Sequence, residues 1–344
     1  MMHAGLDFSR KRLEVQLISD QGERLNFAVL PTIDGLRDLV ARVGRQQPVR
    51  AVIESMTGAR FIHDQLELLG WQVLIADAVK TKGLAPLTCK TDRIDALVLA
   101  QLSRLNLVPE IWLPDPAVRA DREQARWRLH LVRHRTALKN RIHQTLISFG
   151  HPCPVSDLFG ARGRALLTAM ALPQPWRAHV EASLALIDEV DRQIDACDQR
   201  LRPLGTSRAD MRLLQTVPGI GPVLAFTIAS ELGDIRRFGS ATKLVGYTGL
   251  CPSVRQSGDR DYRGPLTGHG PKYLRWALME AAQHAARHPA FSNRYQRTKR
   301  RLGKQRGGKV ATVDVARQLA QAIWFMLTRN QPFAPRGATI PVAA

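Results

Sequence analysis

The sequence has few cysteines, and those it has are scattered. Cys89, Cys153, Cys197 and Cys251 are isolated, with no Cys-x-x-Cys pair and no histidine at the spacing of zinc ligands. This absence argues against both a disulfide framework and a structural zinc site. We expect reduced, partly buried thiols.

Long apolar runs are also missing. The longest apolar stretches fall far short of the ~20 residues that would span a bilayer. Residues 1–10 contain an acid and no apolar run. We therefore expect a soluble, cytoplasmic protein with no membrane partner.

Acidic residues are scarce relative to basic ones. Lysine and arginine number 50 against 30 aspartates and glutamates, which gives a formal net charge of +20 over 344 residues. An excess this large on a folded chain favours a polyanionic partner, DNA or RNA, over a merely basic surface. At this length the chain can form two or three domains of about 100–200 residues each.

Residues 1–112 combine strand-like alternation with helical periodicity, and they are expected to form one domain. The expected strands are residues 4–8, 13–18, 25–29, 49–53 and 71–75, and the expected helices are residues 33–46, 58–70 and 92–106. The order β-β-β-α-β-α-β-α is that of an α/β sheet of the RNase H-like nuclease type.

Four acids fall where such a sheet would bring them together. Asp7 lies on the first strand and Glu54 ends the fourth, while Asp92 and Asp95 share one face of the last helix. Each alone could be an ordinary strand-end or helix-terminal acid. Converging carboxylates would repel one another without divalent cations, and oxygen ligands suit Mg²⁺. We predict that these acids hold Mg²⁺ for chemistry on a phosphodiester.

Residues 113–205 are expected to form a helical middle domain. A long helix over 117–149 carries basic residues on several faces, including Arg126 and Arg133, which suits a helix on nucleic acid or a solvated one. A helix over 177–202 repeats apolar residues in steps of three and four, the pattern of a coiled-coil seam. This seam joins either two helices of one chain or two chains.

Residues 206–330 are expected to form a mainly α-helical domain. Its first part, 213–225, is typical of a helix-hairpin-helix element. There Gly219 and Gly221 would turn the chain so that backbone N–H groups hold a nucleic-acid phosphate. A tight interhelical turn is the alternative.

The end of the chain is first basic and then proline-rich. A basic arm over 294–309 has the composition of a mobile phosphate-binding segment. A last amphipathic helix is expected over 310–328, and residues 331–344 are expected to be a disordered tail.

One serine lies in a glycine-rich loop that runs into a strong helix. A serine before glycine, as in Ser257-Gly258, is most often a turn residue. Cations near it in sequence could clamp a phosphate or only contact a nucleic-acid backbone, and His269 has no assigned role. These cations are Arg260, Arg263, Lys272 and Arg275.

Seven short motifs occur in order along nearly the whole chain. They are GLDFS (5–9), IES (53–55), KTDRIDA (90–96), VPGIG (217–221), GLCP (249–252), QSG (256–258) and YLRWAL (273–278). Together they resemble the motifs of the DEDD transposases. This is the insertion-sequence family one-ten with its Piv-type invertase relatives, also called bridge-RNA-guided recombinases.

The resemblance implies a RuvC-like domain, a helical coiled-coil middle and a transposase domain with a nucleophilic serine. It implies DNA recombination by an insertion-sequence transposase in which Asp7, Glu54, Asp92 and Asp95 bind metal and Ser257 attacks DNA. It also implies a structured guide RNA that pairs with donor and target DNA. Homo-oligomers, dimers and a synaptic tetramer, would compose each active site from two subunits.

The chemistry of a serine nucleophile fits this picture. Attack by Ser257 would conserve bond energy in a phosphoserine, which a DNA hydroxyl later displaces without ATP. Because no obvious side-chain base lies near this serine in sequence, metal or cations must help to ionise it. Two alternatives stay open: a RuvC-like metal-dependent junction endonuclease in which water attacks, and a nucleic-acid-binding regulator that keeps a decayed nuclease fold.

Overall fold

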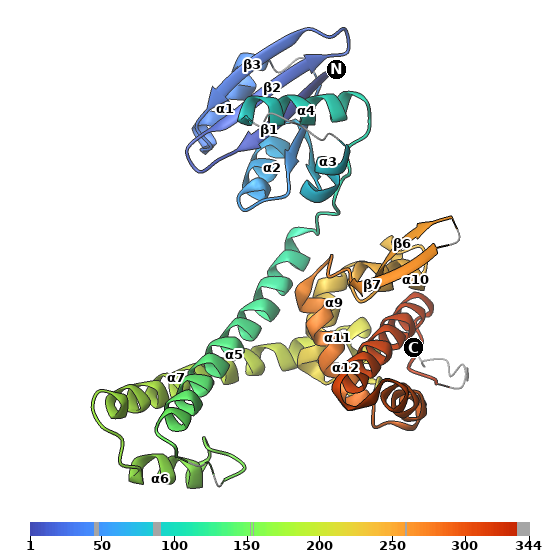
Figure 1. The fold of residues 1–344 in the computed structure, drawn as a ribbon. Coiled ribbons are helices and arrows are strands. Elements are labelled where there is room, and N and C mark those ends of the chain that lie inside the picture. Colours follow the sequence, from blue (N-terminus) through green and yellow to red (C-terminus); the bar gives the residue numbers. More distant parts are fainter. Residues whose placement is uncertain (45–47, 85–90, 152, 154, 259, 336–344) are drawn as a thin grey trace. The chain divides into compact units, whose positions relative to one another are not determined.

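The computed structural model describes residues 1–44, 48–84, 91–151, 153, 155–258 and 260–335 (Figure 1). Cys89, and Lys90 of the third motif, lie outside this range. The chain divides into two compact units, Met1–Leu113 and Pro114–Ala344. None of the described helices is long and apolar enough to cross a membrane.

The first unit is a mixed five-stranded sheet with helices on both faces. Its strand order is β3-β2-β1-β4-β5, with β1 antiparallel to β2 and parallel to β4. The elements are β1 (Met2–Phe8), β2 (Leu13–Ser19), β3 (Arg24–Val29), α1 (Ile33–Val43), β4 (Val49–Glu54), α2 (Ala59–Leu68), β5 (Gln72–Ala76), α3 (Ala78–Leu84) and α4 (Asp92–Arg104). This order is consistent with the predicted RNase H-like sheet, and α3 is the one element that was not predicted.

Different helices cover the two faces of this sheet. On one face Leu6 packs in a core with Leu36 of α1 and Ile62 of α2. On the other face Val52 packs with Leu99 of α4. Since successive strand side chains point to opposite faces, β1 and β4 each present alternate residues to α4.

The second unit is mainly helical. Its helices are α5 (Pro116–Ser148), α6 (Ala161–Ala169), α7 (Trp176–Ser207), α8 (Ala209–Gln215), α9 (Pro222–Leu232), α10 (Ala241–Tyr247), α11 (Lys272–Ala285) and α12 (Pro289–Arg329), with a 3-10 turn at Ile235–Arg237. Within the chain α5 packs on α7, where Leu131 meets Ile194 and Arg135 Nη1 lies 2.6 Å from Asp191 Oδ1. The apolar seam of α7 therefore has a partner in its own chain.

Helix α9 forms the centre of the C-terminal core. Pro222 in its first turn favours the start of the helix, and Gly233 with φ of 63° ends it. Every residue over 225–232 is buried, against α5, α7, α8 and α11. A helix that is buried on all sides should be apolar throughout. Thr227 and Ser230 donate their hydroxyls to carbonyl oxygens of the same helix. Glu231 is the charged exception, and its partner is described below.

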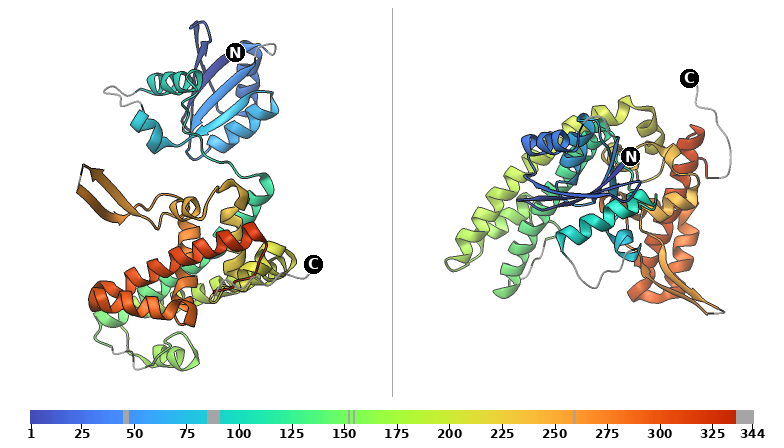
Figure 2. Two further views of the ribbon diagram at one scale, coloured as in Figure 1. Left: turned by 90° about the vertical axis from the view of Figure 1, so that its right-hand side faces the viewer. Right: turned by 90° about the horizontal axis from the view of Figure 1, so that it is seen from above.

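A β-hairpin interrupts the helices, formed by β6 (Pro252–Ser257) and β7 (Arg260–Leu266). The sequence pattern had indicated a glycine-rich loop here. Most residues of both strands are exposed, so the alternation of apolar and polar residues that marks a half-buried strand is absent. In Figure 2 (left) the hairpin extends away from the helices of its own unit.

Two predictions for the end of the chain are wrong. Residues 294–309, expected as a mobile arm, are helical and belong to α12, which turns back on itself at Gly303 (φ 74°, ψ −179°). Residues 331–335, expected as disordered, are packed. Phe333 stacks on Phe291, and its N–H donates to Thr216 Oγ1 at 2.9 Å. Residues 336–344 of the predicted tail lie outside the described residues.

Candidate functional site

Strand β1 and helix α4 run antiparallel in close contact. Near the start of β1, His3 Nδ1 lies 3.0 Å from Ser103 Oγ. At Gly5, an added Cβ would lie only 1.7 Å from the carbonyl oxygen of Ala96, so only glycine fits. Asp7, two residues further, lies on the same face as Gly5. Residues further along β1 therefore lie beside residues nearer the start of α4. Asp7 thus lies beside the first turn of α4.

Strand β4 brings a second acid to this face. The parallel register pairs Leu6 with Ile53, so Asp7 and Glu54 are the next residues on the two neighbouring strands. Val52 packs with α4, and Glu54, two residues later, therefore faces α4 as well. Both Asp7 and Glu54 are half-buried.

The first turn of α4 carries the other two acids. Thr91 caps the helix, its Oγ1 accepting the N–H of Ile94 at 3.3 Å. Asp92, which is exposed, and Asp95, which is half-buried, follow at once. Carboxylates are favoured at a helix N-terminus by the helix dipole, so the local sequence accounts for both the helix start and the position of its acids.

The four acids thus share one face and one end of the sheet. Their donor set suits a hard divalent cation, because all four groups are carboxylates. Among the residues that the structure describes, no group of three or more His, Cys, Asp or Glu side chains is already close enough to hold a metal ion. The fold therefore brings together the backbone positions of the acids, and their side chains do not form a closed ligand cage.

Ser257 lies at the tip of the β6–β7 hairpin. Across the strands Ser257 pairs with Arg260, and Arg255 pairs with Tyr262. Paired residues share a face, so one face of the hairpin carries the serine, two arginines and a tyrosine, all exposed. Gly258 turns the chain with φ of 55°, a conformation that glycine adopts readily.

The cations predicted to surround the serine separate in space. Arg260 shares its face. Arg263 lies on the opposite face, where its Nη2 is 3.2 Å from Asp261 Oδ2. His269 is exposed in the loop that follows β7. Arg260, together with Arg255, which the sequence had not singled out, is therefore best placed to meet a phosphate beside Ser257.

Arg275 holds the base of the hairpin. Its Nη1 donates to the carbonyl oxygen of Thr248 at 3.1 Å, and from α12 Arg317 Nε donates to the carbonyl oxygen of Leu250 at 2.8 Å. These two arginines fix the segment that leads into β6. The sequence had suggested that Arg275 clamps a phosphate. In the structure its partner is a main-chain carbonyl instead.

A cluster of cations surrounds Tyr273 at the start of α11. The guanidinium groups of Arg126 and Arg133 lie 4.9 Å and 5.5 Å from the centroid of its ring, and Lys272 Nζ lies 5.2 Å from it. Cations at this distance from an aromatic face are attracted to it. Sequence reasoning missed the cluster, because Tyr273 is more than a hundred residues from both arginines.

Arg126 is also bound to a buried acid. Its Nε and Nη2 donate to the two carboxylate oxygens of Glu231 at 2.7 Å and 3.0 Å, and the Glu231 side chain is 0% exposed. Burial opposes the charge of this guanidinium, but the hydrogen bonds and the negative charge of Glu231 outweigh it and raise the pKa of Arg126. Arg126, predicted to bind nucleic acid, is half-buried and paired with a core carboxylate, whereas Arg133 is exposed.

The predicted phosphate-binding turn joins α8 and α9. Gly219 has φ of 88°, and an added Cβ there would lie 2.6 Å from the carbonyl oxygen of Ala281, so this glycine is needed for packing on α11. Gly221 caps α9, and nothing lies within 4 Å of a Cβ added to it. With Arg202 and His284 the turn lines a shallow hollow of about 780 Å³. Gly221 therefore has open space beside it, whereas Gly219 is packed against α11.

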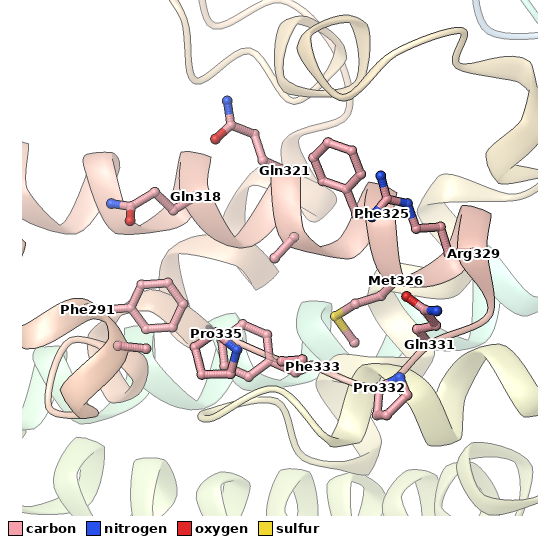
Figure 3. A pocket seen from close by; sticks show the side chains of 13 residues that line it. Phe291, Gln318, Gln321, Phe325, Met326, Arg329, Gln331, Pro332, Phe333 and Pro335 are labelled. Carbon is pink, nitrogen blue, oxygen red and sulfur yellow. The ribbon is translucent and has the colours of Figure 1, made fainter. Parts of the chain in front are cut away.

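A further pocket of about 410 Å³ lies between α12 and residues 331–335 (Figure 3). Phe291, Phe325 and Phe333 line it together with glutamines and Arg329. Its described lining contains no Asp, Glu, His or Cys, so it offers neither a general base nor a metal ligand.

Two family models match the chain in the order of its two units. A transposase model of the DEDD, IS110 type matches residues 4–150, which include all four acids, and the model "Transposase IS116/IS110/IS902 family" matches residues 211–296, which include the hairpin. The chain belongs to this family, the IS110/IS116/IS902 transposases with a DEDD N-terminal domain. The resemblance found in the sequence motifs is thereby confirmed.

Individual relatives agree with this assignment. A Pseudomonas aeruginosa protein named "Probable family 20 transposase" is 30% identical over 223 residues, 61% of this chain and 64% of the relative. The protein y4qE of Sinorhizobium fredii is 28% identical over 193 residues, 56% of this chain and 47% of the relative. The transposase for insertion sequence element IS1328 of Yersinia enterocolitica is 25% identical over 307 residues, 83% of this chain and 86% of the relative. The chain thus spans less than two thirds of the first two relatives.

Proposed function

We propose that this chain is an insertion-sequence transposase that cleaves and rejoins DNA strands in a metal-dependent recombination reaction. The observation that carries the proposal is the shared face of Asp7 and Glu54, on adjacent strand ends beside the first turn of α4. Membership of a transposase family supports it.

The acids Asp7, Glu54, Asp92 and Asp95 would hold the divalent metal, which we take to be Mg²⁺. When bound, the metal would offset the mutual repulsion of the carboxylates and the charge that develops on the attacked phosphate. The carboxylate-only donor set and the position of two acids in one helical turn support this assignment.

Ser257 would be the nucleophile. Its Oγ forms a bond to the phosphorus of a DNA phosphodiester, the bond from phosphorus to one DNA oxygen breaks, and that oxygen leaves as a hydroxyl with the proton the serine has lost. A DNA hydroxyl later attacks the phosphoserine, which frees Ser257 and joins the strands. The exposure of the hairpin tip, and Arg255 and Arg260 on the same face, support this role, because cations stabilise the developing charge.

The finer expectations from the family also enter the proposal. A net charge of +20 suits contact with both a structured guide RNA and the donor and target DNA. The acids and the serine belong to different compact units, which suits active sites composed from two subunits of a dimer or a synaptic tetramer. The α5–α7 pair would act as a coiled coil, and the turn at Gly221, as a helix-hairpin-helix, would hold a DNA phosphate. Sequencing the RNA that copurifies with the chain tests whether it binds a guide RNA.

The decisive experiment looks for a covalent protein–DNA adduct. The chain is incubated with end-labelled DNA, its copurified RNA and Mg²⁺, and the products are separated under denaturing conditions. Wild type should retain label on the protein, Ser257→Ala should lose it, and Ser253→Ala, in the same strand, should keep it. An adduct that survives in Ser257→Ala would refute the serine assignment and direct attention to Tyr262 or Tyr247.

Two other outcomes favour the alternatives. Hydrolytic cuts without joined products, unchanged in Ser257→Ala, would indicate a RuvC-like junction endonuclease in which water attacks. No strand breakage at all, with binding intact, would indicate a nucleic-acid-binding regulator.

A further inference from the structure

The two arms of α12 enclose a basic cleft of about 330 Å³. The helix folds back at Gly303 (Figure 1), so residues before and after the turn face each other. Four guanidinium groups and one carboxylate line the cleft, an excess of three positive charges. The lining residues are Arg294, Arg297, Thr298, Arg301, Val310, Asp314 and Arg317.

The single carboxylate neutralises only one of the arginines. Arg294 Nε and Nη2 donate to Asp314 Oδ2 and Oδ1 at 2.7 Å and 3.0 Å, and this ion pair raises the pKa of Arg294. Within the described part of the chain, Arg297 and Arg301 have neither a hydrogen-bond nor an ion-pair partner. Like charges held this close repel each other, and an anion between them would remove the repulsion.

The backbone of α12 builds the cleft in advance. Arg294, Arg297 and Arg301 are three and four residues apart, a spacing that places them on one helix face. On the opposing arm, a Cβ added to Gly307 would lie 2.3 Å from the carbonyl oxygen of Lys299, so glycine is required for the arms to approach. The backbone positions of the arginines are therefore fixed by packed helices, and their exposed side chains are accessible to a ligand.

The cleft is tied to the hairpin of Ser257. Arg317 lines the cleft and donates from Nε to the carbonyl oxygen of Leu250 at 2.8 Å, two residues before β6 begins. A ligand in the cleft would therefore lie on the side of α12 that holds the base of this hairpin.

We infer that the cleft binds one phosphate of a nucleic-acid backbone through Arg297, Arg301 and the hydroxyl of Thr298. The planar fork of arginine matches the oxygens of a phosphate, and hydrogen bonds between charged partners are the strong ones. DNA and RNA offer the same group, and the experiment below separates them. Nucleic acid as its source rests on the proposed function, whereas the anion site itself does not.

Inorganic phosphate tests the anion site alone. The midpoint of thermal unfolding of the full chain is measured in potassium phosphate and in potassium chloride of equal ionic strength. Wild type should gain about 3 °C in phosphate, because a ligand that binds only the folded state stabilises it. R297Q/R301Q should lose the gain. R300Q/K304Q removes the same charge from exposed residues outside the cleft and should keep it.

Salt dependence of binding tests the source of the phosphate. DNA and RNA oligonucleotides of one length are titrated at several salt concentrations. The slope of log affinity against log salt concentration is negative. For a site that holds one phosphate, its magnitude should decrease by about 1 in R297Q/R301Q and change little in R300Q/K304Q. A fall on DNA only, on RNA only or on both supports the inference and identifies the ligand.

Equal effects of the two double variants would overturn the inference, since general charge would then explain the binding. If phosphate raises the unfolding midpoint but the salt-dependence slope does not change in R297Q/R301Q, the cleft is an adventitious anion site only. This result would also overturn the inference. The Ser257 adduct is measured separately. If the phosphate tests fail but the chain still forms the Ser257 adduct with DNA, the inference is overturned and the proposed function stands.

Discussion

Arg126 of α5 and Glu231 of α9 form a bidentate ion pair at the centre of the second unit, with the carboxylate fully buried. Beside it Arg122 Nε and Nη2 donate to the carbonyl oxygens of Ser230 and Glu231 at 2.8 Å and 2.7 Å. These carbonyls belong to the last turn of α9, which lacks helical donors. Two arginines of one long helix therefore satisfy both a buried charge and a buried helix end.

Glu231→Ala should destabilise the second unit strongly. The substitution empties the fully buried site of the carboxylate and leaves Arg126, which is 36% exposed, without its partner. Breaking a buried pair costs about 3–5 kcal/mol, and solvent around Arg126 places the expected loss at the lower end, about 3 kcal/mol. The free energy of unfolding from urea denaturation measures the loss. Arg133→Gln on the exposed side of the same helix should cost less than about 1 kcal/mol. A similar loss in both variants would contradict the role assigned to the pair.

Gly5→Ala should displace α4 from the sheet. The new Cβ would meet the carbonyl oxygen of Ala96 at 1.7 Å, and overpacking of this kind costs about 3 kcal/mol. Because α4 carries Asp92 and Asp95, DNA cleavage should fall as well. Gly83→Ala in α3 has open space around its Cβ and is the matched control. Unchanged stability of Gly5→Ala, measured by thermal unfolding, would show that α4 can move freely.

Asp7→Asn and Asp95→Asn should strongly slow metal-dependent strand cleavage while leaving DNA binding intact. Each change removes a charged oxygen donor from the proposed metal site, and we expect the cleavage rate to fall by roughly 10²–10³-fold, as for other groups that stabilise transition-state charge. Calorimetric titration with Mg²⁺ or Mn²⁺ gives a second readout. Asp38→Asn, exposed on α1, should behave like wild type. Full cleavage by Asp7→Asn would refute the site.

Arg275→Gln should loosen the base of the hairpin. Loss of its hydrogen bond to the Thr248 carbonyl, one donated by a charged group, is worth about 1.5–3 kcal/mol. Amide hydrogen exchange across β6 and β7 should accelerate at least about tenfold, and adduct formation should slow while DNA binding changes little. Arg263→Gln removes a charge from the far face of the hairpin and should leave exchange at the base unchanged. Equal exchange in both variants would assign Arg275 to nucleic acid instead.

Most of the first unit could be predicted from the sequence because its elements have clear periods. Apolar residues alternate along β1 and β2, and they repeat at helical spacing in α1. The common face of the four acids also follows from strand order and helix position alone. Helix α3 has seven residues and one buried side chain, which leaves too little periodicity to detect.

The second unit was harder to predict because its decisive contacts are long-range. Arg126 and Glu231 are 105 residues apart, and Arg317 and Leu250 are 67 apart. Basic composition over 294–309 indicated mobility, yet a buried stripe in the following arm, with Val315 and Leu319, anchors α12 in the core. The hairpin exposes both of its faces, so its strands leave no apolar pattern.

The hairpin is anchored at its base, at Thr248 and Leu250, and its tip is exposed. With a rise of about 3.4 Å per residue, Ser257 lies about 17 Å along β6 from Pro252, so a tilt of about 10° at the base moves the hydroxyl by about 3 Å. Displacements near 1 Å can already cost a reaction about 10²-fold. Arg275 and Arg317, which hold the base of the hairpin, therefore control where the Ser257 hydroxyl lies.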